Sequence, residues 1–127
     1  PVPKSQVPAM LSQADAFIML LKDSPVFRWG VSPNKLYDYL CASRPVIYGV
    51  NAFNNPVEEA GAGITVAPES PEELAAAVIK LYNMSEQERE QMGINGRKYV
   101  EENHDFRNLA VGLDKVLEEA ISIYKPE

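Results

Sequence analysis

The chain has 127 residues, 46% hydrophobic and 24% charged, which is ordinary for a single globular domain. Its net charge of -6, without a basic stripe, argues against nucleic acid as a partner. A single cysteine excludes a disulfide framework and suits a reducing cytoplasm, and one cysteine with one histidine argues against a metal site.

The first half of the chain alternates short apolar runs with helical segments. We expect a short helix over about 6–13, capped by Ser5, and then a strand over 16–21. Further strands are predicted over 45–50 and 64–67, with a loop at 22–30 and helices over 33–42 and 56–60. Runs without polar alternation indicate strands buried on both faces. The pattern predicts the α/β class, with a partial Rossmann-like parallel sheet of about three strands flanked by helices.

The second half is predicted to be helical, over 71–83, 86–102 and 106–124. We expect apolar stripes to face the core, and Gly93 and Gly96 to allow close packing or a bend. The expected inward residues are Leu74, Val78 and Leu81, and in the last helix Leu109, Leu113, Val116, Leu117 and Ile121. The strand at 17–21 is too apolar for a natural edge, so upstream sequence or a second copy of the chain should pair with it.

One helix start has an unusual charge. Ser32 is a suitable N-cap and Pro33 a suitable first residue, but Asn34 and Lys35 follow where acidic residues are favoured. The starts at 70–73 and 85–88 instead place a glutamate to complete a capping box. A lysine beside free helix amides indicates an anion site. The alternative is a solvated Lys35 paired with Asp38.

This helix should lie where ligands bind, at the carboxyl ends of the strands. Its apolar side is predicted to carry Leu36, Tyr37, Leu40 and Cys41. Lys35 and Asp38 share the opposite side, with Asp38 almost a turn deeper. The helix amides and Lys35 could bind phosphate, and the Asp38 carboxylate could accept hydrogen bonds from sugar hydroxyls. A ligand with both groups in this order is a nucleoside diphosphate.

Several segments together carry a family resemblance. They are Gly30 to Val46, Gly61-Ala-Gly-Ile-Thr-Val66, Ser70-Pro-Glu-Glu-Leu-Ala75 and Met92-Gly-Ile-Asn-Gly-Arg-Lys-Tyr99. The chain resembles the C-terminal, donor-binding half of group 1 glycosyltransferases with the GT-B fold, of the family 4 type. The Ser-Pro-Asn-Lys start is closest to the bacterial surface-polysaccharide branch. The resemblance implies a truncated single domain, residues 1–127, of a longer enzyme whose N-terminal acceptor domain is missing.

The family motif has two glutamates separated by seven residues. Alignment on Pro45-Val46 puts Asp38 at the second glutamate, the usual ribose ligand, and Gly30 at the first, which touches the donor sugar. The resemblance implies that Ser32, Asn34 and Lys35 meet the diphosphate. Gly30, Val31 and Trp29 are the candidate contacts to the donor sugar or base, and no catalytic residue is assigned.

The implied reaction is glycosyl transfer from a nucleotide sugar to a hydroxyl acceptor, with retention of configuration and without metal or other cofactor. It implies a role in polysaccharide or lipopolysaccharide biosynthesis, in the cytoplasm or peripherally at the inner membrane face. The isolated chain is expected to be inactive and to form a homodimer through Phe17–Leu21. The start at Pro1, without methionine, is typical of a piece of a longer polypeptide.

Other interpretations remain open from the residues. A nucleotide-sugar epimerase of the same fold, a receiver-like or flavodoxin-like module, and a non-catalytic α/β binding or interaction module are the alternatives. His104 is expected to be a capping or surface residue rather than a general base. Cys41 is expected in the core, and Gly61–Gly63 in a turn.

Overall fold

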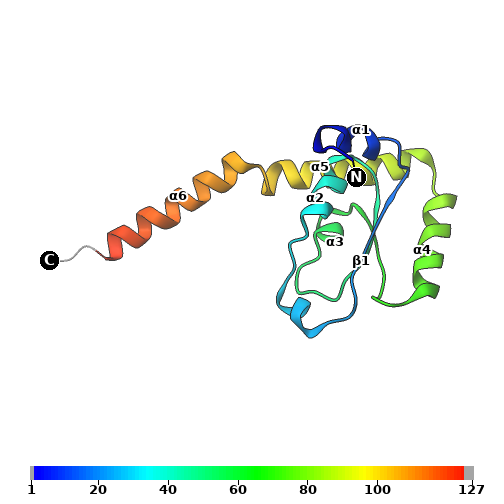
Figure 1. Cartoon of the computed structure of the whole chain (residues 1–127), viewed down its shortest axis with the longest axis horizontal. Helices are drawn as coiled ribbons and strands as arrows, with labels where there is room; N and C mark the ends of the chain where they lie inside the picture. Colours follow the sequence, from blue (N-terminus) through cyan, green and yellow to red (C-terminus); the bar gives the residue numbers. More distant parts are fainter. Residues whose placement is uncertain (1, 125–127) are drawn as a thin grey trace.

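The computed structural model describes residues 2–124 (Figure 1). The first part of the chain forms η1 (Lys4–Gln6), α1 (Val7–Leu11), β1 (Phe17–Leu20), η2 (Pro25–Trp29), α2 (Asn34–Cys41) and β2 (Val46–Gly49). The second part forms α3 (Pro56–Ala60), β3 (Gly63–Thr65), α4 (Pro71–Asn83), α5 (Glu86–Asn103) and α6 (Phe106–Ile123). The predicted order of strands and helices is therefore confirmed.

The three strands form one parallel sheet in the order β1-β2-β3. Phe17 is opposite Val46 in the first pair, and Val46 is opposite Gly63 in the second. A Cβ atom on Gly63 would lie 1.8 Å from the carbonyl oxygen of Val46, so only glycine fits at the start of β3. The predicted α/β class with a parallel sheet is confirmed.

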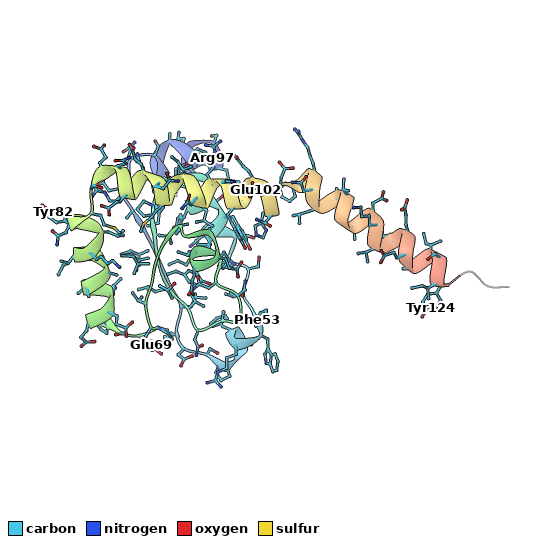
Figure 2. All side chains as sticks on the ribbon, turned by 180° about the vertical axis from the view of Figure 1, so that it is seen from behind. Phe53, Glu69, Tyr82, Arg97, Glu102 and Tyr124 are labelled. Carbon is cyan, nitrogen blue, oxygen red and sulfur yellow. The ribbon has the colours of Figure 1, made fainter. Side chains whose placement is uncertain are left out.

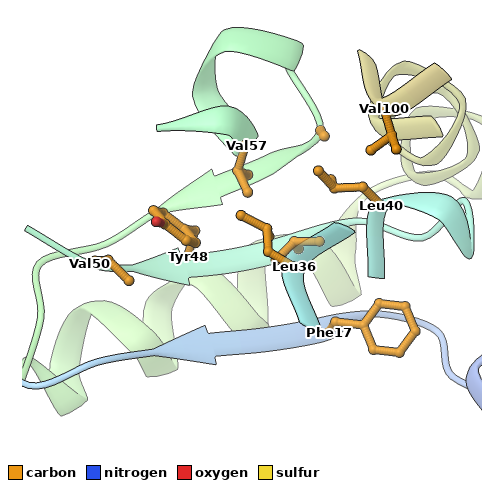
Figure 3. Packing of buried hydrophobic residues seen from close by; sticks show 9 residues of the cluster. Phe17, Leu36, Leu40, Tyr48, Val50, Val57 and Val100 are labelled. Atoms are coloured by element: carbon orange, nitrogen blue, oxygen red, sulfur yellow. The ribbon is translucent and has the colours of Figure 1, made fainter. Parts of the chain in front are cut away.

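Helices cover the two faces of this sheet unequally. On one face α2, α3 and α5 enclose the main core around Tyr48, whose neighbours include Leu36, Leu40 and Val57 (Figure 3). On the other face α4 covers Ile47 with its own apolar residues. The strand β2 is buried on both faces, as its apolar run predicts.

The strand β1 is buried on one face only, contrary to the prediction. Phe17 lies in the main core, whereas Ile18 is 48% exposed and Leu20 is 43% exposed. The reason is that α4 lies over β2 and leaves the outer side of β1 uncovered. Val78 of α4, predicted to face the core, is 45% exposed and lines a cavity of about 440 Å³ beside Ile18. Within residues 2–124, β1 pairs only with β2.

The last helix also differs from the prediction. α6 extends away from the body of the molecule, and its side chains project freely along its length (Figures 1 and 2). The residues predicted to face inward are all exposed: Leu109, Leu113, Val116, Leu117 and Ile121. Their spacing marks an apolar face correctly, but no other described element packs against it.

Close packing of α5 against the body is confirmed at its glycines. A Cβ on Gly93 would lie 2.1 Å from the carbonyl oxygen of Ser43, and one on Gly96 would lie 2.8 Å from Leu40 Cδ2. At the start of the chain the expected cap at Ser5 is wrong. Ser5 lies inside η1, and no side chain caps α1.

Candidate functional site

The start of α2 lies at the carboxyl ends of the strands, as expected. The chain leaves β1, passes through η2 at the end of the body opposite α5, and from there enters α2, which runs toward α5 and packs against it (Figure 1). Phe53, after β2, and Glu69, after β3, lie at this same end, whereas Arg97 lies at the other (Figure 2). In open parallel sheets this is the edge at which ligands bind.

The helix start itself differs from the prediction by one residue. α2 begins at Asn34, and Pro33, not Ser32, is the N-cap, with extended backbone angles of φ -77 and ψ 118. Ser32 cannot act as a cap because its Oγ lies 3.1 Å from the hydroxyl of Tyr37 and is engaged there. The helix also ends at Cys41, one residue before the predicted end.

No side chain caps α2, and its first turn contains no acidic residue. In contrast to α2, the helices α3, α4, α5 and α6 are all capped by a side chain at their start. Their N-cap side chains each accept a backbone N–H: Asn55 for α3, Ser70 for α4, Ser85 for α5 and Asp105 for α6. Only the box at Ser85 is reciprocal, because Glu73 bonds to the amide of Ala67 instead of returning to Ser70. The Leu36 amide bonds to the Pro33 carbonyl at 2.9 Å, so α2 keeps the amides of Asn34 and Lys35 and its partial positive charge available to an anion.

Lys35 and Asp38 are both exposed on α2. They do not pair, because the ion pairs within residues 2–124 are Arg97–Glu101 and Lys98–Glu102. The ion pair that the alternative expects is therefore absent, whereas Lys35 is exposed, as that alternative also expects. The positive charge of Lys35 beside the start of α2 remains available to a ligand.

Asp38 lies one turn further along α2 and lines a hollow of about 310 Å³ between α1, α2 and α5. Cys41 and Arg97 line the same hollow. The prediction that Cys41 lies in the core is wrong, because α1 leaves the hollow open and the thiol exposed. Partial burial still raises the pKa of the Cys41 thiol, and the nearby charge of Arg97 opposes that shift.

The segment before α2 contains the residues proposed to meet the sugar or the base. Trp29 ends η2 and is 92% exposed. Gly30 has φ +117 and ψ 156, a conformation that L side chains rarely adopt. A glutamate in this position would be strained, which gives a backbone reason for the departure from the family motif. Val31 follows with its backbone bonded to Asn54.

Sequence reasoning missed the loop after β2, which holds the β1–α2 connection. Asn54 Oδ1 accepts a hydrogen bond from the amide of Val31, and Asn54 Nδ2 donates one to the Val31 carbonyl, both at 2.8 Å. Asn51 Nδ2 donates to Asp23 Oδ1 at 3.1 Å. The amide of Asp23 donates to Glu69 Oε2 at 3.1 Å, so a carboxylate from the loop after β3 also holds the beginning of this connection. The asparagines that follow β2 were the sequence signal for this loop, because asparagine side chains often bond to backbone groups in turns.

Tyr48 was also missed. Its side chain is fully buried, and its hydroxyl is without a hydrogen-bond partner within the described residues. The hydroxyl points toward the carboxyl ends of the strands (Figure 3). Burial, followed by the proximity of Tyr37, raises the pKa of Tyr48. Among the described residues, a buried polar atom therefore lacks a partner on the face of the sheet that α2 covers.

His104 ends α5 as its C-cap, in agreement with the predicted capping role. Its ring lies between those of Tyr37 and Tyr99, with centroid distances of 4.3 Å and 5.6 Å. The turn predicted at Gly61–Gly63 is present only at its start, with Gly61 in the left-handed conformation at the end of α3, because Gly63 already begins β3. Arg97 and Lys98 pair with glutamates of α5 itself.

The parallel sheet and an uncapped helix at its carboxyl edge define the class of α/β proteins that bind ligands at this edge. A family model described as glycosyl transferases group 1 matches residues 1–84. The chain therefore belongs to the group 1 glycosyltransferases.

One solved structure supports the fold. The chain is similar to sucrose-phosphate synthase from Thermosynechococcus elongatus, with a TM-score of 0.77 and 15% sequence identity. The match covers 96% of this chain and 29% of that chain. The fold is thus that of a GT-B glycosyltransferase fragment, and the chain spans less than a third of the matched protein. A search of curated proteins finds no match. Among residues 2–124 no helix has the length and apolar character needed to cross a membrane.

Proposed function

We propose that this chain is the donor-binding part of an enzyme that transfers a sugar from a nucleoside-diphosphate sugar to a hydroxyl acceptor. Membership of the group 1 glycosyltransferases supports glycosyl transfer. The observation that carries the site is the start of α2 at the carboxyl edge, without a cap or an acidic residue and with Lys35 in its first turn. Ser32, Asn34 and Lys35 are proposed to meet the diphosphate.

The physical reason is that glycosyl transfer leaves negative charge on the departing diphosphate. Helix amides and an ammonium group stabilise that charge without a metal ion. Asp38, one turn further along α2 and free of an ion pair among the described residues, is proposed to accept hydrogen bonds from the ribose hydroxyls. Gly30, Val31 and Trp29 are proposed near the sugar or base.

The finer assignments rest on the resemblance of the Ser-Pro-Asn-Lys start. They are the family 4 type, retention of configuration, independence of metal and other cofactors, and a role in bacterial polysaccharide or lipopolysaccharide biosynthesis. We place the whole enzyme in the cytoplasm, peripherally at the inner membrane face. The isolated chain is proposed to be inactive, on the further proposal that acceptor binding requires a domain other than this one.

The experiment is a titration of the ¹⁵N-labelled chain with UDP and with GDP, followed by NMR. Amide shifts should concentrate at Ser32–Asp38, with millimolar affinity expected from so few contacts, and Lys35→Glu should abolish them. Arg107→Glu, which changes a charge on the distant α6, serves as the control. If neither nucleotide shifts residues 32–38 at millimolar concentration, the proposed site is wrong.

A second proposal concerns self-association. The exposed side of β1 carries Ile18 and Leu20 beside a largely apolar cavity, and the strand has one free edge within the described chain. Exposed apolar edges pair readily with another chain. We propose that the isolated chain forms a homodimer through Phe17–Leu21.

A further inference from the structure

The segment that leads into α2 is held in place from outside by the loop after β2. This loop, residues 51–55, bonds to the β1–α2 connection at three successive points. Asn51 reaches Asp23, the amide of Phe53 donates to the Arg28 carbonyl at 3.2 Å, and Asn54 reaches Val31. The conformation of the approach to α2 therefore depends on a loop distant from it in the sequence.

The contact of Asn54 with Val31 is the most specific of the three. One carboxamide satisfies both backbone polar groups of one residue, at 2.8 Å each, as a neighbouring strand would. The two bonds fix the orientation of the Val31 peptide groups, because donor and acceptor must align together. Both bonds are partly buried, which reduces competition from water.

Gly30 gives this contact its geometry. Its φ of +117 turns the chain from the end of η2 into the reach of Asn54. A Cβ at Gly30 would lie 3.3 Å from Asn54 Oδ1, so the carboxamide lies close against the glycine. On the other side of Val31, Ser32 Oγ meets the Tyr37 hydroxyl. The approach to α2 is thus held on both sides.

A second observation at this place points to a polar ligand. The Tyr48 hydroxyl is buried and lacks a partner among the described residues, and it points toward the same carboxyl edge. Tyr48 and Tyr37 belong to the same core cluster, and Tyr37 is the residue whose hydroxyl holds Ser32. Buried polar groups normally have partners.

We propose that Asn54 is a positioning residue of the donor site. It does not touch the ligand but holds Val31 so that the following residues and the first amides of α2 face the diphosphate together. This inference rests on the proposed function. It predicts that Asn54 affects affinity for the diphosphate group rather than for the nucleoside.

The test compares Asn54→Ala with Asn55→Ala in the 127-residue chain. Asn55 is a matched control because its side chain also makes backbone and side-chain bonds, but at α3 and Thr65. We expect Asn54→Ala to weaken UDP and GDP binding about tenfold, while uridine and guanosine binding changes less than about twofold. Asn55→Ala should lower thermal stability without changing the ratio of diphosphate to nucleoside affinity.

Equal loss of diphosphate and nucleoside affinity in Asn54→Ala, or no loss, would overturn the proposal. If this variant does not fold, Asn54→Asp replaces it, since its carboxylate keeps the acceptor and repels the Val31 carbonyl. Amide hydrogen exchange gives a test without ligand, because the Val31 amide should be protected in the parent chain and released in Asn54→Ala, which removes its acceptor. Fast exchange in the parent chain would also contradict the proposal.

The two proposals fail differently. If the parent chain shows no nucleotide shifts at Ser32–Asp38, the proposed function is wrong, whatever the Asn54 variants do. If the parent chain binds there and Asn54→Ala retains the full preference for diphosphate, only the positioning role is wrong.

Discussion

The ring of His104, at the junction of α5 and α6, lies 4.3 Å from the ring of Tyr37 in α2, measured between their centroids. The hydroxyl of the same Tyr37 lies 3.1 Å from Ser32 Oγ. One side chain thus joins the end of α5 to the segment proposed to bind the diphosphate. The C-terminal helices and the candidate site are therefore physically connected.

This contact predicts a measurable coupling between the two rings. We expect a double-mutant cycle with Tyr37→Leu and His104→Leu to give about 0.5–1.5 kcal/mol of interaction in the free energy of unfolding. Urea denaturation followed by circular dichroism measures it. Additive effects would show that the rings contribute independently.

The Tyr37 hydroxyl can be tested separately. Tyr37→Phe keeps the ring on His104 but removes the partner of Ser32. We expect a loss of stability of about 0.5–1.5 kcal/mol, as for one hydrogen bond, and weaker UDP binding. Calorimetric unfolding and NMR titration measure the two effects. Unchanged UDP affinity would remove Ser32 from the proposed site.

Tyr99 predicts a pH dependence at high pH. Burial and the hydrogen bond of its hydroxyl to Glu59 Oε2 at 2.8 Å raise the pKa of Tyr99 to about 12. The folded protein then holds this proton more tightly than the unfolded chain, whose ordinary value is about 10. The stabilisation is complete below about pH 10 and is lost as the pH rises from 10 to 12.

The absorbance of tyrosinate at 295 nm tests this expectation. The difference between the parent chain and Tyr99→Phe isolates Tyr99, and Tyr82→Phe is the control for an exposed tyrosine. A Tyr99 midpoint near 10 would mean that neither burial nor Glu59 protects it.

Gly93 and Gly112 form a matched pair in neighbouring helices. At Gly93 a Cβ would meet backbone of Ser43 at 2.1 Å, so Gly93→Ala should destabilise the protein by about 1–3 kcal/mol or more. At Gly112 nothing lies within 4 Å, so Gly112→Ala in the exposed α6 should stabilise the helix by about 1 kcal/mol. Thermal unfolding compares them. Equal effects would contradict the close packing of α5.

Self-association of the isolated chain gives a further expected outcome. Light scattering should show a dimer at high concentration, and Ile18→Lys should restore the monomer by placing a charge at the β1 edge. Leu117→Lys places a charge on the apolar face of α6, and therefore tests whether the dimer forms through α6 instead of β1. If only Leu117→Lys dissociates the dimer, the contact lies on α6 instead, and a chain that stays monomeric excludes both.

The order of elements was predictable because each depends on nearby residues. The apolar runs, the cap at Ser85 and the glycines of α5 all carry local signals that the structure confirms. The start of α2 was predictable to within one residue. The prediction failed for Ser32 because the hydroxyl of Tyr37, one helical turn away, engages its side chain instead.

The candidate site was only partly predictable. Lys35 and the lack of an acidic residue in the first turn are visible in the sequence, but the missing cap is not, because Ser32 could have supplied it. The asparagines after β2 indicate a turn, but the contact of Asn54 with Val31 depends on two loops meeting at the edge of the sheet. The exposure of Cys41 likewise depends on where α1 lies.

The sequence by itself determined the α/β class, the parallel strands and the family, because periodicity, caps and short motifs are properties of contiguous residues. Only the tertiary structure decided which apolar faces are covered. α4 buries Ile47 and leaves Ile18 exposed, and α6 keeps its apolar face open, because burial depends on what another segment places against each surface. The same reason explains why Lys35 could be assigned to the site from the sequence and Asn54 could not. Lys35 is recognised from its neighbours at a helix start, whereas the role of Asn54 depends on its bonds to Val31, which is distant in the sequence.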